Sequence, residues 1–579
     1  IMILPGITLI AAAIILLRIF PVVMNLAVTL LSSRLSAGMV MGIWQIARSP
    51  THYARLSLLL ILTAGLGIFA SSFGATLERS FQDRVMHSSG SDIRIEGIQG
   101  REITTYGPQT LSSAYSGVPG VEFATAVLRK RGQDLSKLIG VDYDMFGVDP
   151  AVFARVAFFR NDYAERDVGS LLEKLSAPAI IGIDIPRDAT TLFMRVKPDR
   201  PHPGIRVTAQ IRHPDGSYNI ASFGSLNSDD WINLTAEIRQ YSGTDRDTAS
   251  SLVSIRIHET DPFNSLQAGS LQIDEIGIQT DPGKTITLDS FETLQWKALI
   301  STAEAVSDTV RPATDFLPGE SGSAIFKWSD GASQTIRGFF RGTEYPSIPV
   351  LASQSFIQDT GHSQGDQFEV LVASNRVPVH IVGTVTLFPT VTSPDKRYLV
   401  SDIETLIRYV NLGTFGDTLI ANQVWIKSSL SGPERTHLVE NIRNIGGPVS
   451  TLYDRTKNLE ETRIDPLVNA GWRSLLFLSF GAVLILSCIG FLVHAYMSYK
   501  SRLVQLALMR TIGVSVSQLT TMVWIEQALV VSVGMLLGSW MGARLGTIIM
   551  PFLGHDDWGD KVVPPFITDV NWIALLATY

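Results

Sequence analysis

Long apolar runs lie near both ends of this 579-residue chain, and shorter runs that alternate with polar residues fill its middle. A bilayer core about 30 Å thick is crossed by roughly 20 residues of α-helix. The apolar runs therefore predict an α-helical transmembrane bundle. Its expected segments are a truncated helix over 1–17, helices over 54–77, 474–497 and 517–550, and the start of another helix over 572–579. Because apolar runs reach both ends, we interpret the chain as a fragment of a longer protein.

The segment 18–53 is also apolar over much of its length, but Arg34, Arg48 and Pro50 interrupt it. A helix with this distribution lies along a membrane surface more readily than it crosses the bilayer. We therefore expect an amphipathic cytoplasmic linker between the first two spans.

The charges of the short loops indicate the orientation in the membrane. Segments 18–55 and 500–510 contain Arg and Lys but no acidic residue, whereas the loop 551–571 is rich in aspartate. Basic loops tend to stay in the cytoplasm. We therefore expect a multi-pass protein of the plasma or inner membrane, with 551–571 and the whole of 78–472 in the extracytoplasmic space.

The large region 78–472 has the pattern of an α+β domain. Alternating runs at 251–258, 270–278 and 377–388 predict strands that turn signals separate. Helical patterns are found near 163–175 and near 401–410.

Closely spaced short strands over 179–283 predict a β-sandwich of jelly-roll type, inserted into a core formed by 78–178 and 343–472. The next stretch, 284–342, is also rich in β pattern and either belongs to the sandwich or forms a unit of its own. The strand pattern of the insert resembles that of carbohydrate-binding modules. The insert is therefore interpreted as a structural spacer or as a glycan-binding module.

Composition narrows the class of function. The chain is 45% hydrophobic and 17% charged, and its net charge of −7 comes mainly from acidic residues in the central region. This distribution gives no sign of a nucleic-acid partner. No nucleophile with a base and no paired metal ligands are visible in the sequence, so we expect no catalytic residue, metal or other cofactor in this chain.

One short motif resembles a nucleotide site. Gly283-Lys284-Thr285 is similar to the end of a phosphate-binding loop, but Ile278 stands where the first glycine of that motif is required. We interpret the motif as an ordinary turn.

Two features of the span 517–550 indicate contacts inside the membrane. Gly534, Gly538 and Gly542 recur every four residues, which places them on one helical face and allows close contact with another helix. Glu526 is costly to hold as a charge in lipid, so we expect it to face protein or a polar cavity, either as a helix anchor or as part of transport.

The segment 498–516 connects the last two predicted spans. Leu503, Leu506 and Arg510 fall at helical spacing in it. The pattern ends at Gly513, which predicts a short amphipathic helix on the cytoplasmic side. Such a helix either docks into the groove of a partner protein or lies on the lipid headgroups.

These features carry a family resemblance. The segment RLVQLALMRTIG (502–513), followed by Glu526 and the three glycines, resembles the coupling-helix region of the FtsX-like, MacB-type ABC transporter permeases in their long form with two permease halves. The segments 44–81, 89–97, 348–356, 365–372, 377–385 and 562–572 also resemble sequences of that family. The insert around 179–280 lies outside the resemblance.

The resemblance implies a permease subunit without catalysis of its own, driven by a separate, dimeric ABC-type ATPase at its cytoplasmic face. ATP hydrolysis by this partner would move the outer domain, either to extrude lipid, lipoprotein, peptide or drug, or to transmit force to cell-wall enzymes. Contact with the ATPase would be made by Arg502, Gln505, Leu506, Met509, Arg510 and Gly513. Where the family usually has a glutamate this chain has Gln505, which removes one charge from the expected contact.

A different class of function needs no ATPase. The chain would then be a membrane-anchored protein whose outer domain binds glycan or cell wall, or a sensor whose outer domain reports an antibiotic or peptide to a cytoplasmic kinase. The ligand expected for the outer domain is a glycan, a lipid or a peptide. The expected environment, a lipid bilayer, is the same in both interpretations.

Overall fold

The computed structural model describes most of the chain after residue 49 and six residues before it. These are Ala11, Ile14, Ile15, Arg18, Val22, Thr29, 50–98, 107–136, 140–176, 182–239, 249–280, 283–313, 322–333, 335–342, 347–414, 418–446, 451–463, 466–554 and 561–568. The predicted helices at 1–17 and 572–579 and nearly all of the linker 18–53 lie outside the described residues. The chain divides into two compact units, one made of Ile1–Val85 and Lys457–Tyr579 and the other of Met86–Thr456.

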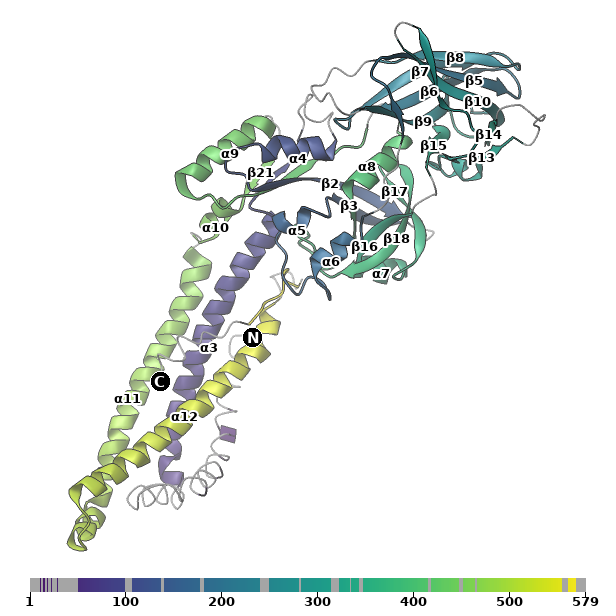
Figure 1. Cartoon of the computed structure of the whole chain (residues 1–579). Helices are drawn as coiled ribbons and strands as arrows, with labels where there is room; N and C mark the ends of the chain where they lie inside the picture. Colours follow the sequence, from purple (N-terminus) through teal and green to yellow (C-terminus); the bar gives the residue numbers. More distant parts are fainter. Residues whose placement is uncertain are drawn as a thin grey trace. The chain divides into compact units, whose positions relative to one another are not determined.

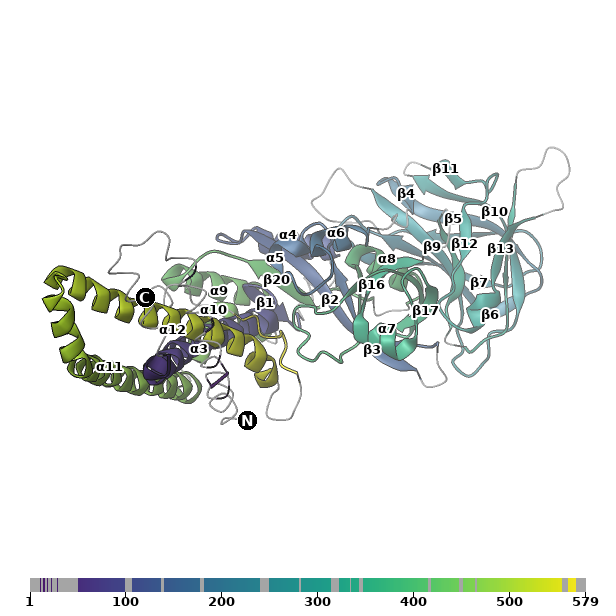
Figure 2. The ribbon, with the colours of Figure 1, turned by 90° about the horizontal axis from the view of Figure 1, so that it is seen from below.

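The first unit is helical. Three of its helices are long and apolar enough to cross a membrane: α3 (Pro50–Ser89), α11 (Pro466–Thr511) and α12 (Val516–Leu553). The shorter helix α10 (Arg455–Arg463) precedes α11. Figure 1 draws α3 beside α11, with α12 crossing it, and Figure 2 gives a second view of the three helices. Apolar side chains of α3, among them Ile61 and Phe69, pack against Met541 and Leu545 of α12.

The structure corrects one expectation in this unit. The sequence predicted a separate short helix in 498–516, but α11 continues without a break to Thr511. No glycine or proline occurs between Gly490 and Gly513, and the segment is rich in Leu, Ala, Lys, Arg and Met, which favour helix. The first break in the helix therefore comes at Gly513, where the sequence placed the end of the pattern.

A closed ring of six strands forms the core of the second unit. The strands follow the order β17-β18-β16-β19-β3-β2, and a pairing between β17 and β2 closes the ring. Their bounds are β2 (Phe123–Asp134), β3 (Val141–Val148), β16 (Ile348–Ser353), β17 (Gln367–Val372), β18 (Asn375–Val385) and β19 (Tyr398–Asp402). Three strands continue the sheet beyond β2 in the order β20 (Gln423–Lys427), β1 (Ile93–Glu96) and β21 (Thr451–Asp454).

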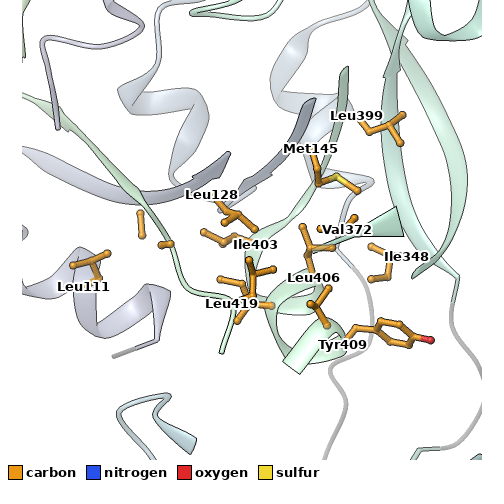
Figure 3. Packing of buried hydrophobic residues seen from close by; sticks show 14 of the residues in the cluster. Leu111, Leu128, Met145, Ile348, Val372, Leu399, Ile403, Leu406, Tyr409 and Leu419 are labelled. Carbon is orange, nitrogen blue, oxygen red and sulfur yellow. The ribbon is translucent and has the colours of Figure 1, made fainter. Parts of the chain in front are cut away.

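Short helices surround this core, and α8 (Ile403–Leu412) contributes most to its interior. The carboxylate of Asp402 accepts a hydrogen bond from the backbone N–H of Thr405 at 3.0 Å and so caps the start of α8. Figure 3 shows Ile403 and Leu406 of α8 among the apolar side chains of the core. The helix predicted near 401–410 is confirmed. The other helices are α4 (Pro108–Ser116), α5 (Phe153–Val156), α6 (Val168–Glu173), α7 (Gln354–Thr360) and α9 (Gly432–Gly446).

The insert consists of two six-stranded antiparallel sheets around one apolar core, and Figure 1 shows them as two layers. One sheet has the order β13-β14-β10-β5-β8 with β11 on β10, and the other has the order β12-β15-β9-β6-β7 with β4 on β9. The strands are β4 (Ile183–Ile185), β5 (Ala189–Pro198), β6 (His202–Arg212), β7 (Tyr218–Leu226), β8 (Ile232–Glu237), β9 (Ser250–Glu259), β10 (Gly269–Thr280), β11 (Lys284–Asp289), β12 (Trp296–Ala298), β13 (Thr309–Pro312), β14 (Ala324–Trp328) and β15 (Arg337–Arg341), with a 3₁₀ turn at Glu304–Ser307.

Strict alternation explains why these strands pack as they do. In β5, Leu192, Met194 and Val196 are buried while the residues between them are more exposed, so one face enters the core. The stretch 284–342 contributes strands to both sheets and therefore belongs with the insert rather than forming its own unit.

The sequence predicted a jelly-roll-type β-sandwich in the insert and did not reveal a barrel. The structure has a closed six-stranded barrel, and this barrel lies in the core rather than in the insert. The insert contains more strands than the eight of a jelly roll. The reason is that 284–342 extends both sheets, which is one of the two possibilities that the sequence left open for this stretch.

Candidate functional site

The end of α11 and the start of α12 form a tight helical turn. Gly513 adopts a left-handed conformation with φ of 101°, which favours glycine. Its N–H donates to the carbonyl of Arg510 at 3.2 Å, and the N–H of Val514 donates to the carbonyl of Met509 at 3.2 Å. Left-handed glycine after the last helical residues is a common helix end.

A reciprocal cap begins α12. The N–H of Gln518 donates to Oγ of Ser515 at 3.2 Å, and the N–H of Ser515 donates to Oε1 of Gln518 at 3.1 Å. This capping box satisfies two N–H groups that a helix start leaves without partners. The turn between the two helices is therefore defined on both sides by its own hydrogen bonds.

The predicted coupling residues all lie on the last turns of α11 or in this turn. Arg502, Leu506 and Met509 recur at helical spacing and are half-buried. Gln505, Arg510 and Gly513 are exposed. The segment 502–513 therefore presents one face to its own protein and another outward.

An ion pair joins the segment to α12. Nη1 of Arg502 lies 2.8 Å from each carboxylate oxygen of Glu526. The side chain of Glu526 is 1% exposed and that of Arg502 is 14% exposed. A carboxylate and a guanidinium buried together cost far less free energy than either one buried alone. The sequence indicated that Glu526 faces protein or a polar cavity, and in the structure its carboxylate faces Arg502.

That partner could have been found from the hairpin geometry. Arg502 and Glu526 each lie twelve positions from Val514 in the sequence. In two antiparallel helices joined by a short loop, residues equidistant from the turn lie at the same height. To predict this partner from the sequence, one needs to know where the turn lies. That position is clear only if α11 is recognised as one continuous helix.

The three glycines of α12 lie against the backbone of α3. A Cβ at Gly538 would lie 2.6 Å from the carbonyl oxygen of Ile61, and a Cβ at Gly542 would clash with the backbone of Gly65. A Cβ at Gly534 would lie 3.1 Å from Cβ of Leu60. Substituents larger than hydrogen therefore do not fit at two of these positions unless the helices move apart.

A polar contact between α3 and α11 was not foreseen. The hydroxyl groups of Thr63 and Ser487 are hydrogen-bonded to each other, and Ser487 also donates to the carbonyl of Leu59 at 3.3 Å. Gly490, one turn further along α11, brings the helix close to the side chain of Leu59. Single serines and threonines are common in apolar helices, so the sequence offered no way to pair these two.

The motif at Gly283 is a hairpin turn. Gly283 has φ of 96° and lies between β10 and β11, which pair directly. Its N–H donates to the carbonyl of Thr280 at 2.5 Å. The interpretation of this motif as a turn is confirmed.

Comparison with known proteins gives little further information. No protein-family model matches the chain, and no curated protein sequence matches it either. One similar solved structure is the periplasmic region of MacB from Actinobacillus actinomycetemcomitans, with a TM-score of 0.24 and 7% sequence identity. The match covers 66% of this chain and 95% of that chain. A likeness this low supports no conclusion about function.

Proposed function

We propose that the chain is the permease subunit of an ABC-type transporter and that a separate, dimeric ATPase acts on the segment 502–513. The observation that carries the proposal is the Arg502–Glu526 ion pair, because it joins that segment to the next apolar helix through a buried carboxylate. The resemblance of the sequence around it to coupling helices supports the same assignment.

The contacts of the helical unit would transmit a displacement of the segment 502–513 first to α12 and then to α3. The hydrogen-bonded turn and the ion pair connect the end of α11 to the first turns of α12. The glycine face of α12 packs directly on α3. Because these contacts involve backbone and buried charge rather than flexible exposed side chains, α11, α12 and α3 would respond together to a push from the partner.

The proposed environment is a lipid bilayer. Leu484, Ile485 and Leu486 occupy consecutive positions on α11 and are between 42% and 62% exposed. Exposure of successive apolar residues around a helix is unfavourable in water and is the normal state of a helix in lipid. In the proposed topology the protein is multi-pass in the plasma or inner membrane, and the unit with the barrel and the insert lies in the extracytoplasmic space.

In this proposal the ATPase contact is made by exposed side chains. Arg510 supplies a charge and Gln505 a neutral amide, while Leu506 and Met509 are half-buried at the edge of the contact. Movement of the outer unit would extrude a lipid, lipoprotein, peptide or drug, or would transmit force to another protein. The chain itself would have no catalytic role.

The test is the ATPase activity of the candidate partner, reconstituted in lipid with the full chain. We expect the double variant Leu506→Ser, Arg510→Glu to stimulate the ATPase at least ten-fold less than the unaltered chain does. A matched control replaces a leucine and an arginine of α12 away from the turn, Leu536→Ser with Arg544→Glu, both of which are exposed. Undiminished stimulation by the first variant, with folding and insertion verified, would refute the proposal.

A further inference from the structure

The insert and the barrel core meet through polar side chains within the second unit. Gln210 of β6 donates to the carbonyl of Asn411 on α8 at 2.9 Å, and Arg256 of β9 donates to the carbonyl of Thr414 at 2.7 Å. Both side chains are buried. The outer face of the β6–β9 sheet is therefore joined to the end of α8 by hydrogen bonds as well as by apolar contact.

A small cavity of about 100 Å³ lies at this junction. Four polar side chains contribute to its wall, three from the insert and one from α8. The lining residues are Arg212, Tyr218, Ser251 and Arg408, with Gly182, Val253 and Leu412. A cavity needs only about 10–15 Å³ of this kind to hold one water, so there is room here for a small ligand.

The charged side chains that line the cavity, Arg212 and Arg408, are both positive. Nη2 of Arg212 and Nε of Arg408 both donate to the same oxygen of Glu404, at 2.5 Å and 2.7 Å. Two guanidinium groups thus share one carboxylate. Asp184 accepts a hydrogen bond from Ser251 at 3.2 Å, but its exposed carboxylate is screened by solvent.

Donors are also in excess. Each guanidinium carries five N–H groups in a planar fork, and the contacts with Glu404 engage one nitrogen of each. Burial raises the pKa of the Tyr218 phenol, so its hydroxyl keeps its proton at neutral pH. Guanidinium forks with a hydroxyl group form the kind of wall that binds oxyanions.

We propose that this cavity binds a phosphate group and that the bound phosphate bridges the insert to α8. A tetrahedral oxyanion fits in this volume and offers acceptors to both arginines and to the tyrosine, which is more than the two oxygens of a carboxylate can do. Arg212 and Tyr218 belong to the insert and Arg408 to the core, so the ligand adds a contact that exists only when the two are packed together. The proposal does not depend on the transporter assignment.

Binding to the folded protein alone raises its stability in proportion to the logarithm of ligand concentration. The experiment is therefore a titration of the full chain in detergent with inorganic phosphate, followed by calorimetry and by thermal unfolding, against sodium chloride of equal ionic strength. The expected result is saturable binding of one phosphate per chain and a rise in Tm that chloride does not reproduce. Absence of saturable binding, or an equal rise with chloride, would overturn the proposal.

Variants locate the site. Arg408→Gln removes one charge and is expected to weaken phosphate binding at least ten-fold. Because that change also removes a contact to Glu404, Tyr218→Phe provides a second test that keeps the ring and its packing, with an expected two- to five-fold loss of phosphate affinity. The hydroxyl of Tyr218 also contacts the side chain of Asn411, so the phosphate-dependent rise in Tm is measured relative to the variant's own Tm without phosphate. Arg376→Gln is the matched control. Arg376 of β18 pairs with Glu369 of β17, and neither residue lines the cavity. Equal affinity in Arg408→Gln and the unaltered chain would place the phosphate elsewhere and overturn the assignment.

A final arm distinguishes free phosphate from a phosphate carried by a larger molecule. Glycerol 3-phosphate that competes with inorganic phosphate would show that a substituted phosphate group enters the cavity. Failure to compete, with phosphate still bound, would assign the site to the free ion.

Discussion

The helices α3 and α12 and the two sheets of the insert are held together by opposite means. The helices touch through hydrogen atoms of glycine, as at Gly538 and Gly542. The sheets of the insert are separated by large side chains, with Phe326 of one sheet and Phe339 of the other at 5.3 Å between ring centroids. The contrast follows from the surroundings, because association in lipid gains nothing from removing apolar surface from water, whereas association in water gains most of its free energy that way.

The insert and the helical unit each contain a buried ion pair. In the insert, Arg337 and Asp308 are fully buried and lie 2.6 Å apart, and the backbone N–H of Ser329 also donates to Asp308 at 3.0 Å. In the helical unit the pair is Arg502 and Glu526, which joins two helices near a turn. The first pair joins β15 of one sheet to the residue before β13 of the other sheet, and the second connects helices that the proposed function requires to move together.

The largest effect is expected in the core of the insert. Phe339→Ala removes a fully buried ring that contacts Trp296 and Phe326, and should lower the free energy of unfolding of the insert by about 3–5 kcal/mol. Phe263→Ala is the matched control, because Phe263 is 94% exposed, and it should change stability by less than about 0.5 kcal/mol. Denaturant unfolding followed by tryptophan fluorescence measures both. A similar effect for the two variants would contradict the packing described here.

A smaller effect is expected where the helices touch. Gly538→Leu places a side chain where the carbonyl of Ile61 lies, and should destabilise the packing of α12 on α3 by about 1–3 kcal/mol. Gly546→Leu is a control on the same helix, since a Cβ there meets nothing within 4 Å. Thermal unfolding in detergent compares the two. Equal destabilisation by Gly546→Leu and Gly538→Leu would contradict the close backbone contact of α12 with α3 at Gly538.

The smallest effect concerns an ion pair of the barrel at its surface. Burial raises the pKa of Asp144, but the hydrogen bond from Arg129 and the charges of Arg129 and Lys396 outweigh it and hold that pKa below its usual value. A depressed pKa in the folded state adds stability above the unfolded-state pKa of about 3.9, and this stability is lost as pH falls through the folded-state pKa. Asp144→Asn should therefore reduce the loss of stability between about pH 5 and pH 2, measured by unfolding at each pH. An unchanged pH profile would show that the pair contributes nothing.

Local patterns in the sequence predicted local structure well. Alternation identified strands that the structure has as β9, β10 and β18, and helical spacing identified α8. The spacing of Gly534, Gly538 and Gly542 indicated a contact face on α12, and the structure has α3 against it. These features depend only on neighbours in the chain, so a period of two or of about 3.6 residues is enough to find them.

The barrel and the cavity, which the sequence did not reveal, depend on residues far apart in the chain. Closure of the barrel requires Val370 of β17 to pair with Asp134 of β2, more than 200 positions away. The cavity beside α8 joins Arg212 to Arg408 across a comparable separation. No periodicity encodes which strand closes a ring or which two arginines converge. The continuation of α11 to Thr511 was missed for a different reason, since a basic end was taken as the limit of the helix although Lys and Arg favour helix formation.

The most direct test of the central claim is the stimulation of the partner ATPase by three variants reconstituted in lipid: Arg502→Gln, Glu526→Gln and the two combined. If the buried pair carries the displacement from the segment 502–513 to α12, each single variant should lose most of the stimulation, and the combined variant should lose no more than the worse of the two. Full stimulation by either single variant, in a protein that is folded and inserted, would contradict the account.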